Sequence, residues 1–255
     1  MSWTVAITGK GGVGKTTVAA LMVARLIAHG RRPVLAVDAD PNSCLDQALG
    51  VRVQKSIGSV REETRELVGK GALTGISKQE ILALRIAESL VEAQDFDLLS
   101  MGRPEGPGCY CYANNVLRDA IHEIAAQYPY VVIDNEAGLE NLSRRIVASV
   151  DLLVIVGDPS ARGLATMRRV YDLAREMGTT FARLALVVNR LRRDELPPAA
   201  AALQAETGAS VLIGIRDDEH LAHLDEQGLR LQELGADSPV VARIDELLRQ
   251  TGVLS

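Results

Sequence analysis

The chain has 255 residues, of which 47% are hydrophobic, and its 28 lysines and arginines are outnumbered by 33 aspartates and glutamates. A chain of this length buries a large apolar core without disulfides, and its net charge of −5 argues against nucleic acid as the main partner. It has no apolar run near the roughly 20 residues of a membrane span and no signal-peptide pattern at its start, so we expect a cytoplasmic protein without a membrane partner.

Strand-like apolar runs alternate along the chain with amphipathic, helix-like segments. The expected strands are 4–8, 33–38, 96–101, 130–134, 152–156, 184–188 and 211–214. This alternation predicts a mostly parallel sheet of seven or eight strands, flanked by helices on both faces. We therefore predict a single α/β domain over residues 1–255, with its ligand at the carboxyl ends of the strands.

A glycine-rich loop follows the first expected strand and fits the phosphate-binding pattern G-x-x-x-x-G-K-[ST]. It comprises Gly9, Lys10, Gly11, Gly12, Val13, Gly14, Lys15, Thr16 and Thr17. The glycines let backbone N–H groups turn toward a polyphosphate, and the helix that begins near Gly14 directs its positive end there. We expect a P-loop NTPase that hydrolyses ATP, with Lys15 on the β- and γ-phosphates and the Thr16 hydroxyl on Mg²⁺. The alternative is a glycine-rich turn with a chance Lys-Thr pair.

Lys10 exceeds what a phosphate loop requires. A second lysine on the glycine turn resembles the signature of the deviant Walker A ATPases, the family of MinD and ParA. This resemblance implies a homodimer with two ATP molecules between the subunits, in which Lys10 is catalytic because it reaches the partner's nucleotide. The alternative is a solvated loop lysine.

Two carboxylates, Asp38 and Asp40, come at the end of the second expected strand. Asp40 stands at the switch I position of the deviant family, and we expect it to orient the attacking water, while Asp38 acts on the water shell of the Mg²⁺. The alternative is that Asp40 caps the following helix. Cys44, just past this segment, is expected to be packed.

Cys109 and Cys111 lie at the end of a loop rich in turn-forming residues, 103–108. Two thiols at i and i+2 share one side of an extended segment and can ligate one Zn²⁺ or Ni²⁺ ion, which leaves that ion half coordinated. A twofold dimer doubles the thiols to four, so we expect an intersubunit metal site. Two alternatives stay open, namely buried core cysteines and a strained disulfide that serves as a redox switch.

Asp134 ends the apolar run 131–133, and Gly138 follows four residues later. This pattern is typical of a Walker B acid followed by the hinge of a switch II loop, and it resembles switch II of the same family. An ordinary exposed aspartate at a strand end is the alternative. A helix expected over 114–127 runs from the cysteine loop to this strand. A shift of the cysteine loop would therefore have a short, rigid route to the switch II segment at Asp134.

The base pocket is expected at Asn189 and Arg216. Asn189 follows the run 186–188, and its amide can pair with the adenine edge. Arg216 stands where relatives in the family often carry a proline, and we expect its guanidinium to stack on the base. His220 and His223 are spaced for one helical face, but they lie among acidic residues, and a metal site there is a minor hypothesis.

Three segments together resemble one branch of the deviant family, the CooC-type ATPases that mature carbon monoxide dehydrogenase by nickel insertion. They are 102–111, 134–138 and 158–163, and the resemblance covers most of the chain. It implies a metallochaperone that dimerises with ATP and metal and delivers Ni²⁺ to apo carbon monoxide dehydrogenase, its client enzyme.

Two rival classes stay open. The loop around Cys109 also resembles that of the nitrogenase iron protein, an electron-transfer ATPase with a [4Fe–4S] cluster between subunits, but segment 134–141 contains no cysteine. A MinD/ParA-type positioning ATPase needs a DNA or membrane surface. The acidic balance and the charge-neutral segment 239–255, which predicts a helix packed on the core, disfavour that class.

Overall fold

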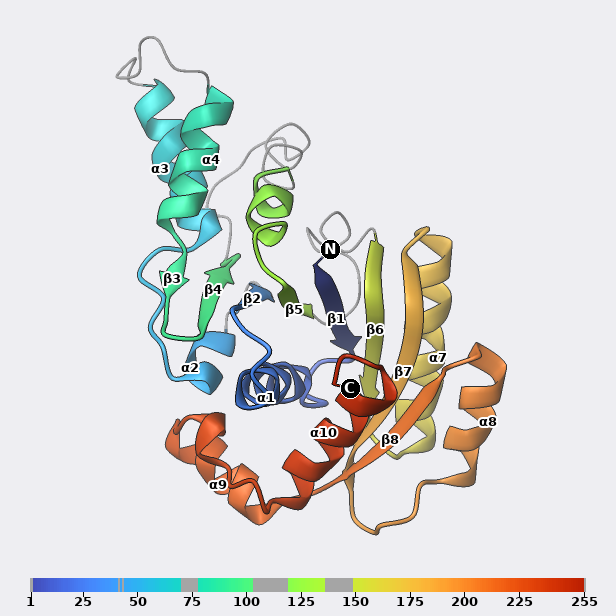
Figure 1. Cartoon of the computed structure of the whole chain (residues 1–255). Helices are drawn as coiled ribbons and strands as arrows, with labels where there is room; N and C mark the ends of the chain where they lie inside the picture. The colour runs from blue at the N-terminus through green and yellow to red at the C-terminus, as the bar shows by residue number, and fades with distance from the viewer. Residues whose placement is uncertain are drawn as a thin grey trace.

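The computed structural model describes residues 2–40, 42, 44–69, 78–102, 119–135 and 149–254. Its strands are β1 (Trp3–Gly9), β2 (Val34–Ala39), β3 (Val91–Glu92), β4 (Phe96–Ser100), β5 (Tyr130–Asn135), β6 (Ser149–Gly157), β7 (Thr180–Leu191) and β8 (Val211–Arg216). They form one eight-stranded sheet in the order β3-β4-β2-β5-β1-β6-β7-β8 (Figure 1). Only β3 and β4 pair antiparallel within it. The predicted α/β fold with a mostly parallel sheet is confirmed.

Helices cover both faces of this sheet. They are α1 (Lys15–Ala28), α2 (Leu45–Leu49), α3 (Ile57–Gly69), α4 (Lys78–Glu88), α7 (Ala161–Glu176), α8 (Pro198–Thr207), α9 (Glu219–Gln227) and α10 (Pro239–Gln250), with the 3-10 turn η1 (Leu231–Glu233) and a helical stretch at 119–125. Alternate strand residues point to opposite faces, so Val5 and Ile7 join the core under α1 and α10, whereas Ala6 joins the core under α7. None of the helices within the described ranges is long and apolar enough to cross a membrane.

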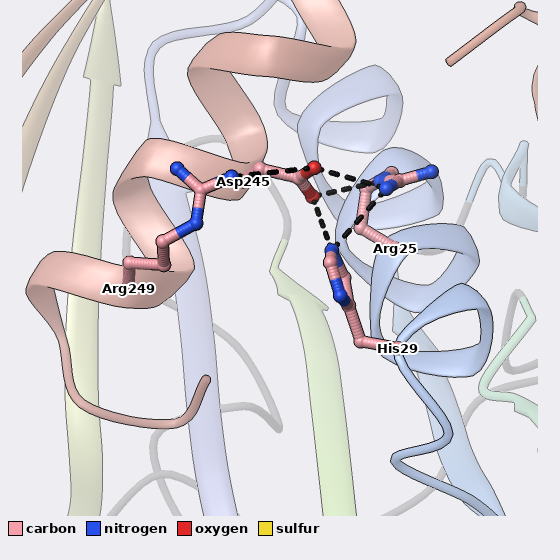
Figure 2. A network of polar contacts seen from close by, with 4 residues as sticks. All are labelled: Arg25, His29, Asp245 and Arg249. Carbon is pink, nitrogen blue, oxygen red and sulfur yellow. Dashed lines mark hydrogen bonds and ion pairs between the residues drawn. The ribbon is translucent and has the colours of Figure 1, made fainter. Parts of the chain in front are cut away.

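The C-terminal helix α10 packs on the core, as its pattern predicts. Its apolar stripe of Val240, Val241, Ile244, Leu247 and Leu248 is buried, and the Ser238 hydroxyl caps its first turn by accepting from Val240 N. The buried Asp245 was not anticipated. It lies in a network of polar contacts that joins α10 to α1, with Arg25 on α1, His29 directly after α1 and Arg249 on α10 (Figure 2).

Several elements differ from those expected from the sequence. The edge strand β3 has only two residues, too few for an alternating pattern to be seen. β7 begins four residues before the expected 184–188 run, and this start was missed because none of its first four residues, 180–183, is buried and they form no continuous apolar run. Of the helix expected over 114–127, residues 119–125 are helical and 126–127 form a turn, while 114–118 lie outside the described residues.

Candidate active site

The phosphate loop lies between β1 and α1, and two of its glycines are required by close contacts. Gly9 has a φ of 153°, and a Cβ there would lie 2.1 Å from the Val156 carbonyl oxygen on β6. Gly14, with a φ of 91°, is the residue before α1, and a Cβ there would lie 2.4 Å from Asn189 Nδ2. Any other residue at these positions would therefore strain the loop and push it away from β6 and β7.

The two lysines of the loop lie in different environments. Lys15 is 7% exposed, and its Nζ donates to the Lys10 carbonyl oxygen at 3.4 Å. The Lys10 side chain is exposed and lies near the loop after β6. There the hydrogen bonds from Ser160, assisted by the positive charge of Lys10, lower the pKa of Asp158 below its ordinary value. Of these two lysines, Lys10 is the one whose side chain is exposed at the surface, where a partner subunit could contact it.

Thr16 and Asp134 meet at the floor of the site. The Thr16 hydroxyl donates to Asp134 Oδ2 at 2.6 Å, and Asp134 is 1% exposed. Asp134 Oδ1 is buried and has no hydrogen-bond partner among the described residues. Burial raises the pKa of Asp134 to about 7, although the Thr16 hydrogen bond lowers it. An unpaired carboxylate oxygen beside a hydroxyl is a donor set that suits Mg²⁺, so the residues present fit this ion.

Asp38 organises the segment between β2 and α2. Its Oδ1 accepts from Asp40 N at 3.1 Å and its Oδ2 from Leu45 N at 3.0 Å. Burial raises the pKa of Asp38 to about 6, against the effect of these two hydrogen bonds. Asp40 Oδ1 accepts from the backbone and side-chain nitrogens of Asn42 at 2.8 and 3.1 Å. Capping of the following helix was the alternative role considered for Asp40. The first N–H of α2, that of Leu45, donates instead to Asp38.

Asn189 connects the end of β7 to the phosphate loop. Its Nδ2 donates to the Val13 carbonyl oxygen at 2.9 Å, and its Oδ1 accepts from Arg190 N at 2.9 Å. Arg190 has a φ of 60°, in the left-handed region, at a register shift of the β7–β8 pairing. Both ends of the amide therefore serve contacts within the protein, and pairing with adenine stays a prediction. The contact with Val13 was missed because the two residues are 176 positions apart.

Arg216 lies at the end of β8 opposite Leu191. Its Nη1 contacts Asp194 Oδ1 at 3.3 Å, and both side chains are more than half exposed. The loop that carries Asp194 thus lies against the end of β8. Stacking of Arg216 on a base stays a prediction.

The candidate metal ligands fall into two groups. Cys109 and Cys111, like Gly138, lie outside the described residues. His220 and His223 are exposed on α9, and the described part of the chain contains no group of three or more His, Cys, Asp or Glu side chains suited to a metal ion. Cys44 was expected to be packed, and that was wrong. It is exposed at the start of α2, because the side chain that faces the core there belongs to Leu45.

Comparison with known proteins adds to this geometry. A family model described as an AAA domain matches residues 3–183. An uncharacterized ATP-binding protein of Methanocaldococcus jannaschii is 39% identical over 244 residues, 95% of this chain and 96% of its own. The carbon monoxide dehydrogenase accessory protein CooC of Rhodospirillum rubrum is 36% identical over 186 residues, 68% of this chain and 70% of its own. The solved structure of the cell division ATPase MinD of Pyrococcus furiosus superposes with a TM-score of 0.72 at 21% identity, with both chains fully covered; this similarity concerns the fold alone.

Proposed function

The chain belongs to the AAA-domain family and is a P-loop ATPase, and from this premise we propose that it is an ATP-dependent metallochaperone that inserts nickel into the active-site cluster of carbon monoxide dehydrogenase. The observation that carries the proposal is its similarity to an accessory protein of that enzyme. The pair Cys109 and Cys111 supports it, because two thiolates suit a soft metal cargo.

In the proposed ATPase cycle each residue of the candidate active site has one task. The backbone N–H groups of residues 11–17 and Lys15 bind the β- and γ-phosphates. Thr16 and Asp134 hold Mg²⁺, which neutralises charge on the phosphates when bound. Asp40 orients the water that attacks the γ-phosphate. Asp38 keeps segment 38–45 in place through its two backbone hydrogen bonds, so that Asp40 stays beside the phosphate loop.

Dimerisation joins the nucleotide to the cargo in this proposal. The exposed Lys10 crosses to the partner's ATP, and the four thiolates of two subunits enclose one Ni²⁺ or Zn²⁺ ion on the twofold axis. Residues 119–125 and β5 connect the segment after the cysteines to Asp134. ATP binding closes the dimer around the ion, and hydrolysis opens it to release the ion to the client.

The metal half of the proposal is tested by metal content and mass. The purified protein is loaded with Ni²⁺ or Zn²⁺ and a non-hydrolysable ATP analogue, and metal analysis is combined with light scattering. We expect one ion per dimer in the wild type and in Cys44→Ala, the matched control with an exposed cysteine. The double variant Cys109→Ala, Cys111→Ala should be metal-free. One ion per dimer in that double variant would contradict the proposal.

The client is tested by transfer. Nickel-free carbon monoxide dehydrogenase is mixed with the metal-loaded protein and ATP, and the recovered enzyme activity is followed. Activation should require ATP and be lost in Lys10→Ala. Absence of activation together with ATP-dependent binding to DNA or to lipid vesicles would instead support the rival class, a positioning ATPase of the same fold.

A further inference from the structure

Besides Asp134 Oδ1, two buried oxygen atoms at the carboxyl ends of β1 and β5 lack hydrogen-bond partners among the described residues. Thr8 Oγ1 and Asn135 Oδ1 belong to residues that are 0% exposed, and neither atom has a hydrogen-bond partner in the part of the chain that the structure describes. Nearly all buried polar atoms in proteins are paired, either with protein or with an ordered water. Two such atoms therefore point to a bound molecule if they lie close together.

The register of the sheet brings them together. Ile7 on β1 pairs with Asp134 on β5, so the following residues, Thr8 and Asn135, lie side by side and point to the opposite face. Asn135 Nδ2 donates to the Ile7 carbonyl oxygen at 3.0 Å, which fixes the amide on this seam. The outer neighbours in register are Ile155 beside Thr8 and Ala39 beside Asn135. Neither neighbour offers a polar side chain to these two oxygens.

We propose that Thr8 and Asn135 hold one internal water molecule between them, and that this bridge positions the phosphate loop relative to Asp134. Neighbouring strands are about 4.8 Å apart, a gap that two hydrogen bonds through one water can span. The chemistry is complementary: the water donates to Asn135 Oδ1, which can only accept, and the Thr8 hydroxyl donates to the water.

The position of the bridge gives it a role in catalysis. Thr8 directly precedes Gly9 of the phosphate loop, and Asn135 directly follows Asp134. On the other face of the sheet, the Thr16–Asp134 hydrogen bond joins the same two parts of the site. The bridge therefore completes a connection on both faces of the β1–β5 seam. Its loss should affect kcat more than KM, because affinity for ATP depends mainly on the loop N–H groups and Lys15, whereas the rate depends on their alignment with Asp134.

The test compares Thr8→Val, which keeps the shape and removes the hydroxyl, with Thr8→Ser, which keeps the hydroxyl. Thr207→Val on α8 is the matched control, because its buried hydroxyl donates to the Leu203 carbonyl oxygen far along the chain from the loop. We expect Thr8→Val to raise the unfolding equilibrium constant about tenfold, the loss expected for one hydrogen bond, and to lower kcat with KM nearly unchanged. Thr8→Ser should restore both, and Thr207→Val should change stability alone.

Two results would overturn the proposal. If Thr8→Val is more stable than the wild type and equally active, the hydroxyl is truly unpaired and no water is held. If Thr8→Val loses stability but keeps its kcat, as Thr207→Val should, the site is structural only. Magnetisation transfer from a long-lived water to the amide protons of Gly9 and Asn135 in the wild type gives a direct readout should Thr8→Val fail to fold, and its absence contradicts the bridge.

Discussion

Replacing Asp245 by asparagine tests how α10 is held against the helix of the phosphate loop. Arg25 on α1 donates from Nε and Nη2 to the two carboxylate oxygens of Asp245 at 2.7 and 2.9 Å, and His29 Nε2 lies 3.1 Å from Oδ1 (Figure 2). The Asp245 and Arg25 side chains are only 10% and 16% exposed. Asparagine keeps the shape and removes the charge, which leaves a largely buried guanidinium without its counter-ion.

The structure sets the size of this effect. Breaking a buried ion pair from one side costs about 3–5 kcal/mol, and because both side chains keep some contact with water we expect the lower end, about 3 kcal/mol. For a chain of this length that corresponds to a fall in Tm of roughly 6–12 °C. Arg249 lies 3.8 Å from Asp245 and is 59% exposed, so Arg249→Ala, the matched control, should cost less than about 1 kcal/mol.

The effect should also depend on pH. Burial by itself raises the pKa of Asp245, but the hydrogen bonds from Arg25 and His29 outweigh it and hold the pKa below the ordinary value of 3.8. The folded state then binds this proton less tightly than the unfolded state, so the stabilisation is fully present above the unfolded pKa and is lost as the pH falls through the folded one.

Urea unfolding of the wild type and Asp245→Asn at pH 7 and at pH 3 measures both quantities. The difference between the two proteins should be large at pH 7 and smaller at pH 3. Equal stabilities at pH 7, or a difference that is the same at both pH values, would refute this account of the network.

Three further predictions concern the nucleotide site. Gly14→Ala should abolish ATP binding in a fluorescent-nucleotide assay. An alanine would be strained at a φ of 91°, and its Cβ would lie 2.4 Å from Asn189 Nδ2, so the loop would have to move. Wild-type affinity would show that the loop adapts to the added side chain. Asn189→Leu should weaken ATP binding about tenfold or more, as the buried Val13 carbonyl oxygen loses its donor, and an unchanged Kd would argue that this contact is dispensable. Asp40→Ala should leave ATP binding intact and lower the ATPase rate by about a hundredfold or more, the loss expected for a positioned catalytic group, whereas a normal rate of hydrolysis would show that Asp40 has no part in the mechanism.

Some features of the site could be predicted because they are encoded in contiguous sequence. The glycines of the phosphate loop, Lys15 and Thr16 follow one another in a single short segment. Their spacing in the sequence is therefore enough to predict the loop and the start of α1. The ends of β2 and β5 could be predicted to within one residue, at Asp38 and Asp134, because an apolar run that stops at a carboxylate marks the end of a buried strand. The two-residue β3 carries too few residues for any periodicity.

Other features depend on contacts between residues far apart in the chain. Thr16 and Asp134 are 118 positions apart, Val13 and Asn189 are 176, and Arg25 and Asp245 are 220. The two hydrogen bonds that Asp38 accepts from the N–H groups of Asp40 and Leu45 were also not anticipated, and its expected action on the water shell of the metal stays a prediction.

The sequence by itself determined the α/β class, the parallel sheet and the ATP-binding loop, because hydrophobic period and glycine spacing act over a few residues. Only the tertiary structure decided which buried polar groups meet. The order of strands in the sheet places β5 and β6 on either side of β1, and this adjacency brings Asp134 to Thr16 and Asn135 to the Ile7 carbonyl oxygen. A buried polar atom must find its partner wherever the fold brings one within reach, and no local pattern of residues specifies that choice.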